Sequence, residues 1–132
     1  MIGDVIYTLL NSDTDVEALV GNKIYPSLAI EDVDYPYIVY EQTANDPQDD
    51  KDGPSTLDTL TYNIEIYTET LSESSDLGVK VRRVLDRYSG TTLGQVIQSV
   101  KYNTENSGYS DDNGRVHLKM QVYNFRYLNP LT

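Results

Sequence analysis

The residues that could do chemistry are few, and the first candidate is the acidic run QDDKDG, which begins at Gln48. It places Asp50, Asp52 and Gly53 at the third, fifth and sixth positions of a calcium-binding EF-hand loop. The match then stops. The first position is Gln48, the twelfth is Thr59 where a bidentate glutamate is needed, and no helices are expected on either side. The run is therefore interpreted as a solvated loop rather than as a calcium site.

Catalytic constellations are not expected elsewhere. His117 is the single histidine and the chain has no cysteine, so these residues cannot supply a zinc site or a histidine-activated nucleophile. Glu65 and Glu69 belong to one expected strand, but nothing predicts the burial that would tune them as an acid and base pair. The glycines form no phosphate-binding loop and no dinucleotide fingerprint. We expect no catalytic residues, no cofactor and no metal, and hence no enzyme.

The charge of the chain sets a second limit on function. Twenty-one acidic residues against 10 basic ones give a net charge of −11, which disfavours binding to nucleic acid or to an anionic membrane. An acidic wall beside DNA would nevertheless leave the DNA mobile, because it repels the phosphates. No apolar run approaches the ~20 residues of a membrane helix, and the amino terminus lacks the basic start of a secretion signal. We expect one soluble domain spanning residues 1–132.

The periodicity of apolar residues predicts the elements that must position these groups. Two short amphipathic helices are expected first, the second capped by Asp13 and ended by Gly21. A longer helix is expected to begin with a capping box of Thr70 and Glu73 and to end at Gly90. Strands are predicted in five segments: KIYPSLAI, YPYIVYEQT, TLTYNIEIYTET, QVIQSVKYNTE and RVHLKMQVYNFRYL. The fold class is therefore α+β, a mainly antiparallel sheet of about four to five strands with helices packed on one face.

Two segments between these elements are predicted to be turns or loops. Residues 44–56 have no periodicity and concentrate Asp, Pro and Gly, which predicts a long, mobile acidic loop. The letters DDNG at residues 111–114 favour a tight hairpin turn. A change of alternation near Val122 and Tyr123 indicates a bulge in the last strand.

The longest predicted helix carries a group of basic residues away from its apolar stripe: Lys80, Arg82, Arg83 and Arg87. Asp76 and Asp86 stand at helical neighbour spacings and should partly neutralise them. On an acidic molecule this group is either a solvated helix face or a surface that pairs head to tail with a second copy, which makes a ring when the rotation closes. Both interpretations stay open.

Several segments together resemble the tail-completion or tail-terminator proteins of long-tailed bacteriophages and gene-transfer agents. They cover nearly the whole chain and are IYTLL, DVEALVGNKIYPSLAI, YPYIVYEQT, VKVRRVLDRYSG and VHLKMQVYNFRYL. The resemblance implies a small α+β subunit of the virion tail or neck, assembled in the bacterial host cytoplasm, that performs no covalent chemistry. It further implies a ring, expected to be a hexamer, that caps the tail tube protein and joins it to the head-tail connector protein. DNA would pass through the lumen without specific binding.

Two groups of residues are hypothesised to make the contacts of such a ring. Asp49, Asp50 and Asp52 are assigned to a partner-docking loop, and Arg82, Arg83 and Arg87 to the subunit interface. Two alternative functions are considered besides this hypothesis. One is another head-tail neck component, such as a connector or head-closure protein, and the other is a small acidic inhibitor protein that mimics the charge of nucleic acid.

Overall fold

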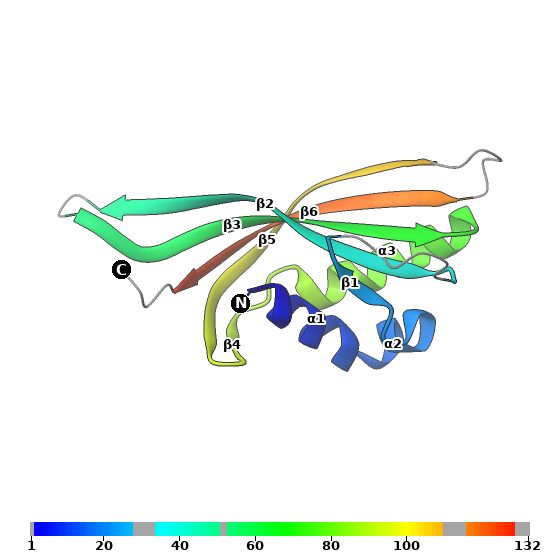
Figure 1. The fold of residues 1–132 in the computed structure, drawn as a ribbon, viewed down its shortest axis with the longest axis horizontal. Helices are drawn as coiled ribbons and strands as arrows, with labels where there is room; N and C mark the ends of the chain where they lie inside the picture. Colours follow the sequence, from blue (N-terminus) through cyan, green and yellow to red (C-terminus); the bar gives the residue numbers. More distant parts are fainter. Residues whose placement is uncertain (1, 28–33, 51–52, 110–115, 129–132) are drawn as a thin grey trace.

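The computed structural model of the chain describes residues 2–27, 34–50, 53–109 and 116–128. Its elements, in chain order, are α1 (Ile2–Ser12), α2 (Thr14–Val20), β1 (Ile24–Pro26), β2 (Tyr37–Asp50), β3 (Gly53–Thr68), α3 (Leu71–Leu85), β4 (Gly90–Thr92), β5 (Gln95–Tyr109) and β6 (His117–Leu128). The strands form a six-stranded sheet in the order β1-β2-β3-β6-β5-β4. The helices gather beneath one face of this long, twisted sheet (Figure 1).

The predicted α+β class is confirmed, and the sheet differs from the prediction in two details. It has six strands instead of four to five, and it is mixed, because β1 runs parallel to β2 while the other neighbouring strands are antiparallel. The unpredicted strand is β4, which pairs with the first residues of β5. Three residues are too few to show an apolar period, so only pairing reveals it.

The amino-terminal helices form where the sequence places them. The carboxylate of Asp13 accepts hydrogen bonds from the backbone N–H groups of Asp15 and Val16, both at 3.0 Å, which satisfies donors that the helix itself leaves open. Gly21 ends α2 with a φ of 61°, a conformation that favours glycine. The apolar positions of both helices are buried in the core: Ile2, Val5, Ile6, Leu10, Val16 and Val20.

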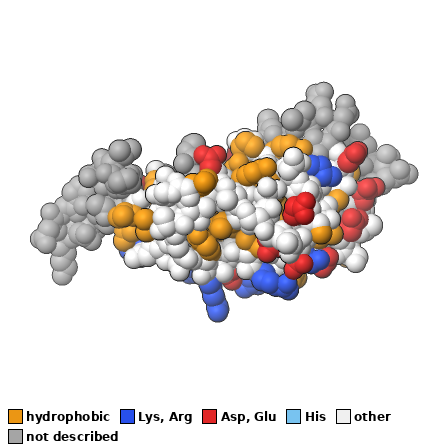
Figure 2. Space-filling model, turned by 90° about the horizontal axis from the view of Figure 1, so that it is seen from below, with side chains coloured by type: hydrophobic (Ala, Val, Ile, Leu, Met, Phe, Trp, Pro, Cys, Tyr) orange, Lys and Arg blue, Asp and Glu red, His pale blue; other side chains and the backbone are white. Residues whose placement is uncertain are grey.

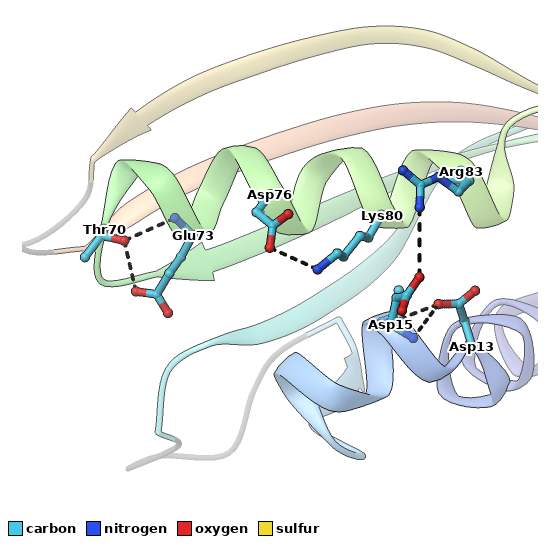
Figure 3. A network of polar contacts seen from close by, with 8 residues as sticks. Asp13, Asp15, Thr70, Glu73, Asp76, Lys80 and Arg83 are labelled. Carbon is cyan, nitrogen blue, oxygen red and sulfur yellow. Dashed lines mark hydrogen bonds and ion pairs between the residues drawn. The ribbon is translucent and has the colours of Figure 1, made fainter.

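The start of α3 was predicted correctly, but its end was not. Thr70 caps the helix, because its hydroxyl accepts the N–H of Glu73 at 3.1 Å and donates to the Glu73 carboxylate at 3.0 Å (Figure 3). The helix ends at Leu85 rather than at Gly90. Contacts with β5 end it early.

Those contacts come from the two residues that follow α3. The carboxylate of Asp86 accepts the N–H of Tyr102 at 3.2 Å, and the N–H of Arg87 donates to the carbonyl of Val100 at 2.8 Å. Arg87 reaches this partner with a φ of 66°, outside the helical region. The sheet thus supplies partners for the Asp86 side chain and for the backbone N–H of Arg87, which a helical period cannot reveal.

The loop predicted over residues 44–56 is mostly strand. β2 and β3 stay paired from Tyr37 and Tyr67 out to Asp50 and Gly53, although the pairing of β3 with β6 ends at Leu57. Beyond Leu57 the hairpin therefore consists of β2 and β3 alone, with Asp49 opposite Pro54 and Asp50 opposite Gly53, and this two-stranded arm extends away from the helices (Figure 1). Two register shifts in β2 break its alternation, so the sequence pattern looked irregular. The mobility of this segment stays a prediction.

The remaining predictions for the strands have mixed outcomes. Tyr62, Ile64 and Ile66 are buried on one face of β3, as their alternation predicted. The predicted bulge lies opposite the expected strand: the register shifts on β5 between Tyr102 and Thr104, the partners of Tyr123 and Val122. Residues 111–114, the predicted hairpin turn, lie outside the described residues.

Candidate interaction surfaces

The three arginines predicted at a subunit interface lie together at the carboxyl end of α3. Arg82, Arg83 and Arg87 line a shallow hollow of about 410 Å³ with Val79 and Asp86. Figure 2, which looks onto the helix side of the molecule, shows lysine and arginine side chains gathered along its lower margin. Arg87 belongs to this group although it follows the helix end instead of lying on the helix. The structure therefore brings the predicted group together.

The arginines are held by different partners. The Nε of Arg82 lies 3.3 Å from the Asp86 carboxylate, and its guanidinium lies 3.9 Å from the centre of the Tyr102 ring, a cation–π contact. Arg83 extends toward α2, with its Nη1 3.9 Å from the carboxylate of Asp15 (Figure 3). That pair is mostly exposed, so it contributes little to stability. The guanidinium of Arg83 is thus accessible to a partner.

Charge along α3 is partly neutralised, as the spacing of its acids predicted. Lys80 pairs with Asp76 at 3.0 Å (Figure 3), and Arg82 pairs with Asp86. Two exposed apolar side chains accompany the arginines on this helix: Leu71 is 63% exposed and Val79 is 57% exposed. We call the exposed side of α3, made by Leu71, Val79, Arg82 and Arg83 together with the adjoining Arg87, the outer α3 surface.

The acidic docking residues lie elsewhere. Asp49 and Asp50 are in β2, near the end of the arm, whereas Asp52 lies outside the described residues. The arm and α3 lie in different parts of the molecule (Figure 1). The two predicted contact groups therefore form separate surfaces, and the docking role of the first stays a prediction.

A buried polar network that the sequence did not predict fixes α3 to the sheet. The amide nitrogen of Gln121 donates to the carbonyl of Gly78 at 2.9 Å and to the carboxylate of Glu105 at 3.0 Å. Its amide oxygen accepts the hydroxyl of Tyr123 at 2.7 Å. Lys119 completes the network with an ion pair to Glu105 at 3.2 Å. Gln121 is fully buried, so all its polar atoms depend on these partners.

The charges of this network follow from its geometry. Burial alone would raise the pKa of Glu105, but hydrogen bonds from Gln121 and Lys119 outweigh it and hold that pKa below its ordinary value. Burial raises the pKa of the Tyr123 hydroxyl. Gly78 allows the close approach, because a Cβ there would lie 2.7 Å from the Cδ of Lys119. The network therefore keeps one ionised carboxylate and one neutral phenol.

We expect Gln121→Ala to lower the free energy of unfolding by about 3 kcal/mol, because it leaves the Gly78 carbonyl and the Tyr123 hydroxyl without their partner. Urea denaturation followed by circular dichroism measures this loss. Gln98→Ala is the matched control, since Gln98 is exposed on β5 and should change stability by less than ~0.5 kcal/mol. Equal losses for the two variants would show that the network does not hold α3.

Tyrosines form a second cluster on the sheet, on the face opposite the helices. The rings of Tyr37 and Tyr67 stack with centroids 4.8 Å apart, and Tyr35 stacks on Tyr37 at 5.4 Å. The ring of Tyr25 meets Tyr37 edge-on at 6.4 Å. The hydroxyl of Tyr67 donates to Glu65 at 2.9 Å, and burial together with this hydrogen bond raises the pKa of Tyr67. Glu65 thus accepts a bond from this cluster.

The residues considered for chemistry remain apart. Glu65 contacts Tyr67, while Glu69 is exposed beyond the end of β3. His117 begins β6, in register with Thr68 and Tyr109. Within the described ranges, no group of three or more His, Asp or Glu side chains is placed to hold a metal ion. None of the helices described here has the length and apolarity of a membrane span.

Comparisons with known proteins agree with one another. The family model described as tail completion protein gp17 matches residues 4–127. A chain of the solved structure described as "Virion of native gene transfer agent (GTA) particle" superposes with a TM-score of 0.77, covering 97% of this chain and 95% of that chain. The two sequences are 15% identical, so this likeness shows a shared fold. No curated protein matches the chain.

Proposed function

Because this chain belongs to the tail completion protein gp17 family, whose model spans residues 4–127, we propose that it closes the end of a phage tail tube as a ring of identical subunits. The resemblance inferred from the sequence is confirmed, and the protein is a structural component of a phage tail. Ring formation, the docking partners and the number of subunits belong to the proposal. The family match along nearly the whole chain is the observation that carries it.

In the proposed assembly the ring seals the tail tube and joins it to the head-tail connector protein. Assembly takes place in the cytoplasm of the bacterial host, and a hexamer is the expected ring. The net charge of −11 supports a lumen that repels the phosphates of DNA, so that DNA passes without specific binding.

Two surfaces have roles in this proposal. The outer α3 surface lies between neighbouring subunits, where Arg82, Arg83 and Arg87 meet acidic groups of the next copy. The arm formed by β2 and β3 docks on the tube or on a neighbour through Asp49, Asp50 and Asp52. A two-stranded hairpin without further strands beside it is marginally stable in water, so a partner surface would order the arm.

Electron microscopy of tails assembled without this protein tests the proposed function. We expect over-long or unsealed tails, and we expect purified protein to restore closed ends when it is added during assembly. Tails of normal length with detached heads would instead assign the protein to the head-side neck. Normal, head-joined tails together with a monomer that binds a basic enzyme in a salt-sensitive manner would favour charge mimicry and would overturn the proposal.

A further inference from the structure

The face of the sheet opposite the helices carries many apolar side chains. Tyr37, Tyr67 and Leu118 are in register across three strands, and Val39, Glu65 and Met120 form the next row. We call this region the aromatic face, and its apolar members come from four strands: Tyr25 of β1, Tyr37 and Val39 of β2, Tyr67 of β3, and Leu118, Met120 and Val122 of β6. No helix of the described residues covers it (Figure 1).

Alternation along the strands establishes which side these residues occupy. Ile38, Ile64 and Ile66 are fully buried and belong to the core that the helices cover. Their neighbours in sequence, such as Val39 and Tyr67, must therefore point to the other side. Val39 is only 3% exposed even there, and the other apolar members of the face are half-buried, so these side chains pack on one another and leave part of their surface to solvent. A solvated face of an antiparallel sheet normally carries polar side chains, and apolar patches of this kind mark interaction sites.

The charge of the aromatic face is negative. Its three rows, from the pair Tyr37 and Tyr67 to the pair Asn63 and Val122, include the carboxylates of Glu41 and Glu65. Among the described residues of these rows, none is a lysine or an arginine. A partner that fits this face therefore combines apolar side chains with positive charge.

The outer α3 surface of the same chain has that composition. It offers the exposed Val79 beside Arg83 and Arg87, and the exposed Leu71 at the start of the helix. Arginine also suits a tyrosine-rich partner, because a guanidinium binds well over an aromatic ring. Arg82 already makes this kind of contact within the subunit, over Tyr102.

We propose that the aromatic face of one copy receives the outer α3 surface of the next copy. This inference rests on the proposed ring and names its contact. The two surfaces lie on opposite sides of the sheet, because α3 packs on the helix side with its outer surface turned away. Such a contact joins unlike surfaces, so each added subunit exposes a new aromatic face until the ring closes.

Edge-to-edge pairing of sheets is less compatible with the strands. The outer edge of β2 carries Pro47 and two register shifts, and β5 has its own shifts after Ile97 and Tyr102. Proline and bulges are features with which proteins prevent strand addition. The exposed charge of Glu41 adds to this protection.

Disulfide crosslinking tests the contact directly, since the chain has no cysteine of its own. One preparation carries Val79→Cys on α3 and the other carries Met120→Cys on the aromatic face. Under mild oxidation the mixture is expected to give linked dimers, while each preparation alone gives few. A chain with both substitutions is expected to give a ladder of linked multimers whose longest member counts the subunits. Thermal unfolding checks that both variants fold.

A second pair of variants separates the possible failures. Gln42→Cys mixed with Asn106→Cys reports contact between the edges of β2 and β5. Suppose that the wild-type protein forms multimers, and that linked dimers come from this pair but not from Val79→Cys with Met120→Cys. That result would overturn the inference about the contact but would leave the proposed ring intact. Wild-type protein that stays monomeric at every concentration and on tail tubes would overturn both the proposed ring and the inferred contact. Glu41 is exposed, and Glu41→Lys would place a positive charge opposite the arginines of the outer α3 surface. This variant should weaken self-association about tenfold if the contact is correct.

Discussion

Replacing residues 48–57 by Asn-Gly is expected to give a folded subunit that no longer closes tails. Pro47 and Asp58 are partners across the hairpin, so a two-residue turn can join them. Of the pairs between β3 and β6, only that of Leu57 is removed, so the core should remain. Losing a docking element should weaken binding to the tube by about 30-fold to 1,000-fold, the range of interface hot spots. Co-sedimentation with tail tubes measures this loss, and circular dichroism verifies the fold.

A control of unchanged length separates the shape of the arm from its charge. The triple variant Asp49→Asn, Asp50→Asn and Asp52→Asn keeps the length of the arm but removes three charges. If the carboxylates dock the protein, this variant should lose most of the same binding. Binding near the wild-type level would assign docking to the shape of the arm. A shortened variant that closes tails normally would show that the arm has no docking role.

Arg83→Glu is expected to shift the protein toward monomers, with at least a tenfold higher concentration needed for assembly. A tenfold change corresponds to about 1.4 kcal/mol, which reversal of one charge at an interface readily produces. The effect on folding should be small, because the contact of Arg83 with Asp15 spans 3.9 Å between side chains that are 66% and 61% exposed. Solution mass measured over a range of concentrations tests the shift.

Lys101→Glu is the control for this reversal, since it makes the same change in net charge at an exposed site on β5. It should leave the assembly unchanged, whereas Arg83→Glu should not. Wild-type assembly should also weaken as salt rises, because salt screens accessible charges. Equal oligomer masses for wild type and Arg83→Glu would exclude Arg83 from the subunit interface.

The sequence by itself determined the elements whose signals are local. Asp13 and Thr70 mark helix starts because a side-chain oxygen three residues away satisfies open N–H donors, and the same rule applies in any fold. The alternation of Tyr62, Ile64 and Ile66 predicted the buried side of β3, because successive strand residues face opposite ways. The ion pairs of Asp76 with Lys80 and of Arg82 with Asp86 followed from helical spacing in the same way, because residues four apart are neighbours on a helix.

Only the tertiary structure decided the features that depend on residues far apart in the chain. α3 ends at Leu85 because Val100 and Tyr102 offer backbone partners from another strand. The acidic segment is an arm because its two halves bond to each other, which requires neither an apolar face nor a regular period. Gln121 becomes a buried hydrogen-bond donor to α3 only because α3 crosses β6 at that point.

The aromatic face shows the same division most clearly. Each strand alone offers only one to three apolar residues there, and β3 even places Asn63 and Glu65 among them. Register across β1, β2, β3 and β6 brings these residues together, and register is a long-range property that local spacing does not encode. Local geometry thus specified helices, caps and strand sides, whereas the pairing of distant strands produced the surfaces by which the subunit can bind its neighbours.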